Sequence, residues 1–127
     1  ARSGRDATIV TYGSGVDLAL RTADELADEA SIEVVDLRSL WPLDRDTILD
    51  SVSRTSRLLV LQEAARSIGV ANAVCALVAS RGFDLLDAPP VIHAPIDTPV
   101  PYAAELEDAY LPSAASLERE LRELLAY

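Results

Sequence analysis

The chain has 127 residues, half of them hydrophobic and a quarter charged, a composition that predicts one globular domain over residues 1–127. Its formal net charge of −10 argues against nucleic acids and anionic membranes as partners, because their phosphates would repel it, and favours a basic partner. The single cysteine, Cys75, excludes an internal disulfide and is typical of a reducing compartment. Because the sequence contains no methionine, we expect a fragment of a longer chain rather than a processed product.

The first predicted strand-turn-helix unit organises the rest of the chain. Thr8–Tyr12 is a run of β-branched and aromatic residues that predicts the central strand, and Gly13–Gly15 predicts a tight turn at its carboxyl end. Ser14 is the expected N-cap of a helix with one apolar stripe, formed by Val16, Ala19, Leu20, Ala23, Leu26, Ala27 and Ala30. Ile32–Leu37 predicts a second strand, parallel to the first because a helix connects them.

The middle of the chain predicts two further helices and a third strand. Asp44 is expected to cap a short helix that ends near Thr55, and the apolar run Leu58–Leu61 predicts a strand buried on both faces. Val70–Arg81 predicts the next helix, with Gly82 just after its end. This helix has almost no polar face, so we expect another subunit or domain to cover it.

The last third of the chain completes an alternating pattern of strands and helices. Pro90–Ala94 predicts a short fourth strand, the proline-rich stretch Ile96–Leu111 is expected to be irregular, and Ser113 is expected to cap a terminal helix. The pattern predicts a three-layer α/β/α sandwich with a mainly parallel sheet in the strand order 2-1-3-4. Its switch-point crevice is then expected between Gly13–Gly15 and Gln62–Gly69.

Two features beside this crevice are candidate functional sites. Gly13-Ser14-Gly15 precedes a helix and could hold an anion, but a tight turn with a cap is the favoured interpretation, because the only nearby basic residue is Arg66. Gln62-Glu63 follows a strand and could supply a functional acid, although a lone Glu without a visible partner is more often structural.

The remaining candidates favour structural roles. His93 has no recognisable nucleophile beside it, so we expect a packed or hydrogen-bonded histidine, and Cys75 is expected to be an inert small hydrophobe. Trp41 is expected to anchor the connection into the second helix, with an exposed interface aromatic as the alternative. One His, one Cys and scattered carboxylates form no recognisable metal site. The residues alone therefore favour a docking or assembly module over an enzyme.

Four stretches of the chain carry motifs that occur together in one family. They are Thr8–Glu29, Val34–Asp44 (Val-Val-Asp-Leu-Arg-Ser-Leu-Trp-Pro-Leu-Asp), Leu58–Gly69, and Asp97–Ser113 with its Asp-Thr-Pro-Val-Pro-Tyr-Ala opening. In this order and spacing they resemble the C-terminal domain of transketolase-like proteins. The closest resemblance is to the β subunit of E1, the thiamine-diphosphate-dependent component of 2-oxo acid dehydrogenases (pyruvate or branched-chain type). The Asp97–Ser113 run favours this subunit over the corresponding domains of deoxyxylulose phosphate synthase and transketolase.

The resemblance implies a function for the whole enzyme and a narrower one for this chain. E1 decarboxylates a 2-oxo acid on thiamine diphosphate with Mg and passes the acyl group to the lipoyl arm of E2. The cofactor lies between a domain of the α subunit and the N-terminal domain of β, so this chain is expected to bind neither cofactor nor metal, to carry no catalytic residue and to be inactive alone. The expected location is the bacterial cytoplasm or, in a eukaryote, the mitochondrial matrix.

The resemblance also implies partners and docking residues. The C-terminal domain of β contributes to assembly with the α subunit and a second β subunit (α₂β₂) and docks the subunit-binding domain of E2. The family's docking pattern corresponds to Asp87, ahead of Ala88-Pro89, and to the terminal carboxylate of Tyr127 where the polypeptide ends there. The family's sheet has a fifth, antiparallel edge strand, expected just before this chain begins.

The chain departs from the family at two positions, and two other interpretations stay open. Many members carry a histidine where Gln62 stands, and a second glycine next to Gly69. One alternative is the equivalent domain of another transketolase-superfamily enzyme. The other is a free-standing α/β module that binds a ligand or phosphate in the switch-point crevice.

Overall fold

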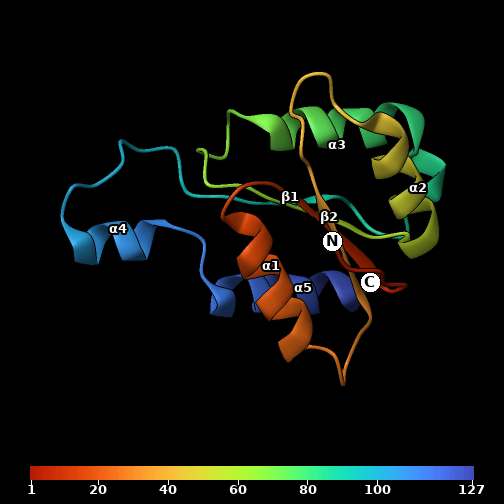
Figure 1. Ribbon diagram of the computed structural model, residues 1–127, viewed down its shortest axis with the longest axis horizontal. Helices are drawn as coiled ribbons and strands as arrows, with labels where there is room; N and C mark the ends of the chain where they lie inside the picture. Colours follow the sequence, from red (N-terminus) through yellow and green to blue (C-terminus); the bar gives the residue numbers. More distant parts are fainter.

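A four-stranded parallel sheet forms the centre of the molecule in a computed structural model that describes residues 1–127 (Figure 1). The strands are β1 (Ala7–Thr11), β2 (Ile32–Asp36), β3 (Leu58–Leu61) and β4 (Val91–His93). They lie in the order β2-β1-β3-β4, which confirms the predicted order 2-1-3-4. Each pair is parallel because a helical crossover returns the chain to the same end of the sheet.

Helices cover both faces of the sheet and confirm the predicted three layers (Figure 1). Helices α1 (Gly15–Glu25) and α5 (Ala114–Leu125) pack on one face, and α2 (Arg45–Thr55) and α3 (Val70–Arg81) pack on the other. The core therefore consists of two separate apolar clusters, one on each side of the sheet. None of the helices is long and apolar enough to cross a membrane.

The central strand β1 shows why the sheet needs both helical layers. Ile9 pairs with Val34 and Leu59 and packs toward α1 and α5, whereas the next residue, Val10, packs toward α2 and α3. Successive side chains of a strand point to opposite faces of the sheet. A central strand that is apolar throughout therefore needs a layer of helices on each face.

The structure corrects three sequence-based boundaries. The prediction that Ile96–Leu111 is irregular is wrong in part, because a short helix, α4 (Ala104–Tyr110), forms between Pro101 and Pro112. Its Ala, Glu and Leu residues have high helix propensity, which favours the turn once the prolines are passed. Helix α1 ends at Glu25, earlier than its apolar stripe, which continues through turns. The Phe83–Leu85 segment adds a turn of 3₁₀-helix, η1.

An antiparallel contact borders the sheet on the β2 side. Arg2 and Val34 exchange two backbone hydrogen bonds of 3.1 and 2.9 Å, and Ala1 donates to the same Val34 carbonyl at 2.7 Å. The resemblance placed an antiparallel edge strand before the first residue. The bridge at Arg2 is isolated and belongs to no strand, so the antiparallel edge strand that the resemblance implies stays a prediction.

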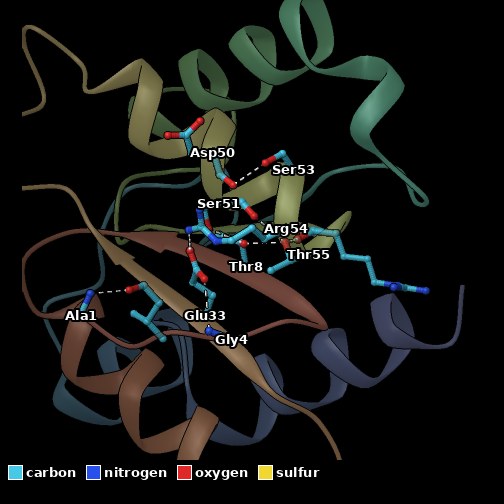
Figure 2. A network of polar contacts seen from close by, with 11 residues as sticks. Ala1, Gly4, Thr8, Glu33, Asp50, Ser51, Ser53, Arg54 and Thr55 are labelled. Atoms are coloured by element: carbon cyan, nitrogen blue, oxygen red, sulfur yellow. Dashed lines mark hydrogen bonds and ion pairs between the residues drawn. The ribbon is translucent and has the colours of Figure 1, made fainter.

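A buried polar network fastens α2 to the sheet (Figure 2). The Thr8 hydroxyl of β1 lies 2.8 Å from that of Ser51 and 2.7 Å from that of Thr55, and all three residues are buried. At the edge of this network, Arg54 of α2 donates to Glu33 of β2 at 2.5 Å. Buried hydroxyls and carboxylates are stable only when they are hydrogen-bonded, so the network fixes where α2 lies.

Glu33 makes the stability of the fold dependent on pH. Burial by itself raises the pKa of the Glu33 carboxyl, but hydrogen bonds from Arg54, Ser51 and the Gly4 backbone outweigh it and hold the pKa below its ordinary value of 4.5. A carboxyl group whose pKa is lower in the folded state stabilises that state above its unfolded pKa. This contribution is lost as the pH falls through the folded pKa.

We therefore predict that Glu33→Gln lowers the free energy of unfolding at pH 7 by about 1 kcal/mol, discounted because Arg54 is half-exposed. The difference from wild type should shrink as the pH falls below 4.5 and through the lower pKa of folded Glu33, because the wild-type carboxylate then takes up a proton and loses its charged hydrogen bonds. Urea denaturation at several pH values measures both effects. Glu25→Gln, at an exposed position on α1, is the control. A deficit of constant size down to pH 3 would contradict the assignment.

Candidate functional site

The crevice at the carboxyl ends of β1 and β3 brings Ser14 and Glu63 together. Ser14 is the N-cap residue of α1, as predicted, but its hydroxyl donates to the Glu63 carboxylate at 2.6 Å and makes no capping hydrogen bond to the helix. Glu63 likewise has a partner that its place in the sequence does not reveal. The two residues lie 49 positions apart, so only the parallel pairing of β1 with β3 brings them into contact.

The crevice is acidic. Burial raises the pKa of the Tyr12 hydroxyl, and the nearby Glu63 carboxylate raises it further. Arg66, the one basic residue expected near the crevice, lines a different cavity with Glu123 and Tyr127. Arg38 lines a cavity with Gly13 of the turn, but its guanidinium pairs with Asp36 at 2.6 Å. No three His, Cys, Asp or Glu side chains gather to hold a metal ion.

Gln62 organises the loop that borders this crevice. Its side chain is 2% exposed, and its amide nitrogen lies 2.7 to 3.2 Å from the carbonyl oxygens of Ala64, Ala65 and Ile68. Its amide oxygen accepts a hydrogen bond of 2.9 Å from the backbone N–H of Ala71, at the start of α3. No local signal in the sequence indicates this role, because the path of the loop sets the positions of these backbone groups.

Gly69 makes room for the Gln62 amide. Its φ of +111° is a conformation that other residues rarely adopt, and a Cβ atom there would lie 2.7 Å from the Gln62 amide oxygen. The loop therefore depends on this pair of residues, one supplying the hydrogen bonds and the other the space.

We predict that Gln62→Leu lowers the free energy of unfolding by about 2 kcal/mol or more, because the Ala71 N–H and several carbonyls would lose their partner. Denaturation with urea measures this loss. Glu63→Leu, at the exposed neighbouring position, is the control and should cost less than about 1 kcal/mol. Equal stability of Gln62→Leu and wild type would show that the loop does not need the amide.

The surroundings of His93 and Cys75 favour structural roles for both side chains. His93 is 6% exposed, with Nε2 3.2 Å from the Ser116 hydroxyl and Nδ1 2.9 Å from a Glu120 carboxylate oxygen on α5. The expected packed histidine is therefore found, held between β4 and α5. Burial raises the pKa of Cys75 to about 11, so its thiol stays protonated at neutral pH.

The outer side of α3 is apolar and uncovered in the single chain. Trp41 is 88% exposed, so the prediction that it anchors the connection is wrong and the alternative of an exposed aromatic fits. With Leu40 and Leu43 it borders a cavity of about 380 Å³ whose other wall includes Ala73 and Ala76 of α3. That another subunit covers this helix stays a prediction.

Asp87 lies at the opposite end of the sheet from the crevice. It is exposed, precedes β4, and its backbone N–H donates to the Ser56 carbonyl at 2.8 Å, beside the amino end of β3. The next residue, Ala88, is buried.

Tyr127 lies near the same end of the edge strand. Ser116, near the start of α5, contacts His93 at the carboxyl end of β4, whereas Leu124 and Tyr127 line a cavity with Val91 at its amino end. Helix α5 therefore runs antiparallel to β4. The fold brings Tyr127 and the segment after Asp87 to one edge of the molecule, although they are far apart in the sequence.

The chain matches the family described as "Transketolase, C-terminal domain" over residues 1–117. Among curated relatives, it is 45% identical over 125 residues to the acetoin:2,6-dichlorophenolindophenol oxidoreductase subunit beta of Cupriavidus necator, covering 98% of this chain and 37% of that protein. It is 46% identical over 127 residues to the pyruvate dehydrogenase E1 component subunit beta of Leifsonia xyli, covering 99% and 37% respectively.

Further similarities agree with these. The chain is 46% identical over 119 residues to the mitochondrial pyruvate dehydrogenase E1 component subunit beta-1 of Arabidopsis thaliana, covering 93% of this chain and 33% of that protein. A solved structure described as "Split gene transketolase, inactive beta4 tetramer" aligns with a TM-score of 0.82 at 25% identity, over 98% of this chain and 40% of its own. The chain thus spans about a third of the length of the curated relatives named here.

Proposed function

The chain belongs to the transketolase C-terminal domain family, and from this premise we propose that it is the assembly and docking domain of an E1 β subunit in a 2-oxo acid dehydrogenase complex. In this proposal, decarboxylation on thiamine diphosphate with Mg takes place on parts of the enzyme outside this chain. The partners are an α subunit, a second β subunit and the subunit-binding domain of E2. The whole enzyme works in the bacterial cytoplasm or the mitochondrial matrix.

One observation carries the docking part of the proposal: Asp87 and Tyr127 belong to the same edge of the fold. The amino end of β4 and the carboxyl end of α5 meet there, and Tyr127 shares its cavity with Glu120, Glu123 and Arg66. Both Asp87 and Tyr127 are exposed, so a partner can reach them without any change in the fold. In a chain that ends at Tyr127, the terminal carboxylate adds a further negative charge.

The charges of this edge suit a basic partner. The net charge of −10 attracts such a partner over long distances, and exposed carboxylates at the contact give the complex its specificity. The apolar side chains Val91 and Leu124 in the wall of this cavity also offer a place for the aliphatic part of a lysine or arginine.

We predict that Asp87→Lys, in the full-length β subunit assembled with its α subunit, weakens binding of the E2 subunit-binding domain by about 2 kcal/mol or more, because a like charge then faces the basic partner. Calorimetric titration measures the affinity. Wild-type affinity should also fall as salt is added.

Asp46→Lys is the matched control, since it changes the net charge equally at an exposed position near the start of α2, at the opposite end of the sheet. Its affinity should stay close to that of wild type. If Asp87→Lys binds as tightly as Asp46→Lys, Asp87 is not a docking residue. If the wild-type subunit binds no E2 domain at all, the docking function itself is wrong.

A further inference from the structure

The segment Ile96–Pro112, here called the arm, extends away from the rest of the molecule (Figure 1). Its helix α4 has no buried residue and lies to one side of the sandwich. The large hydrophobic side chains of the arm are nevertheless exposed: Ile96 is 70% exposed, Val100 56%, Leu106 60%, and Tyr102 fully. Exposed apolar side chains gathered on one segment are typical of a surface that a partner covers.

Both ends of the arm are held in place. Near its start, the Asp97 carboxylate accepts a 2.9 Å hydrogen bond from the backbone N–H of Ser67, and this contact lowers the pKa of Asp97. At its end, Ser113 and Ser116 form a capping box that starts α5. Prolines restrict the backbone at positions 95, 99, 101 and 112. The arm is therefore preorganised, and a partner that binds it does not have to order a flexible chain.

A groove of about 480 Å³ separates the arm from the body of the molecule. Leu106 and Tyr110 of α4 form one wall, and His93 of β4 with Ser116 of α5 forms part of the other. This space is large enough to receive several side chains of a partner. The one arginine in its wall, Arg119, has no ion pair within the chain.

The charges of the arm indicate the kind of partner. All of its charged residues are acidic, namely Asp97, Glu105, Glu107 and Asp108. A second copy of this chain, with a net charge of −10, would bring mostly like charges to this surface. The arm therefore suits a different protein whose apolar side chains are flanked by lysines or arginines.

We propose that the arm clasps the companion subunit of the enzyme, with apolar side chains of that subunit in the groove and its basic side chains against Glu105, Glu107 and Asp108. This inference rests on the proposed function, since the designation "subunit beta" of the relatives implies a companion subunit. It concerns a surface separate from the Asp87 edge, so the two can be tested independently.

The test co-expresses the full-length β subunit with its companion subunit and measures the dissociation constant of the assembled enzyme. Leu106→Asp should raise it about tenfold or more, because it places a charge in the apolar wall of the groove. Glu105→Lys combined with Glu107→Lys should also weaken assembly, and should reduce its dependence on salt. The thermal midpoint of the β subunit alone should stay unchanged, because α4 contributes nothing buried to the fold.

Two controls match these variants. Phe83→Asp places the same charge at an exposed hydrophobic residue outside the arm, and Glu25→Lys with Asp28→Lys reverses two exposed charges near the end of α1. Wild-type assembly by both arm variants would overturn the proposal. So would an effect on self-association of β alone, which would make the occupant a second copy. Loss of assembly with intact E2 binding supports the arm and the Asp87 edge as separate surfaces, whereas a wild-type subunit that assembles with no companion refutes the proposed function itself.

Discussion

Everything in this molecule depends on a parallel sheet that is apolar on both faces. Ile9 and Val10 of the central strand belong to different apolar clusters, so neither helical layer can be removed without exposing core residues. Because the strands are parallel, all their carboxyl ends lie at one end of the sheet and all their amino ends lie at the other. The chain thus has two ends of different character, and the functional surfaces differ accordingly.

α/β sheets often bind ligands in the crevice at the carboxyl ends of their strands. In this chain, the polar side chains of that crevice are hydrogen-bonded to one another and to the backbone. Its loop is fixed by the buried amide of Gln62, and Ser14 donates to the one acid that could otherwise interact freely.

The surfaces that suit partners lie at three other places on the molecule. One is the acidic edge near Asp87 and Tyr127, one is the arm, and one is the apolar groove between Trp41 and α3. Two of these surfaces expose large hydrophobic side chains that a single chain has no means of covering. The proposed assembly role predicts such exposed apolar side chains in the chain taken by itself.

The sequence by itself determined the order of the strands, the three layers and the family, because alternating apolar runs and helix caps act over a few residues. It also identified Asp87 as a candidate docking residue and predicted that His93 is packed. Only the tertiary structure decided that the Ser14 hydroxyl bonds to Glu63 instead of to the backbone of α1, that Trp41 is exposed, and that the arm contains α4 and stands apart. These features depend on contacts between residues far apart in the chain, or on their absence, and no local pattern of residues encodes them.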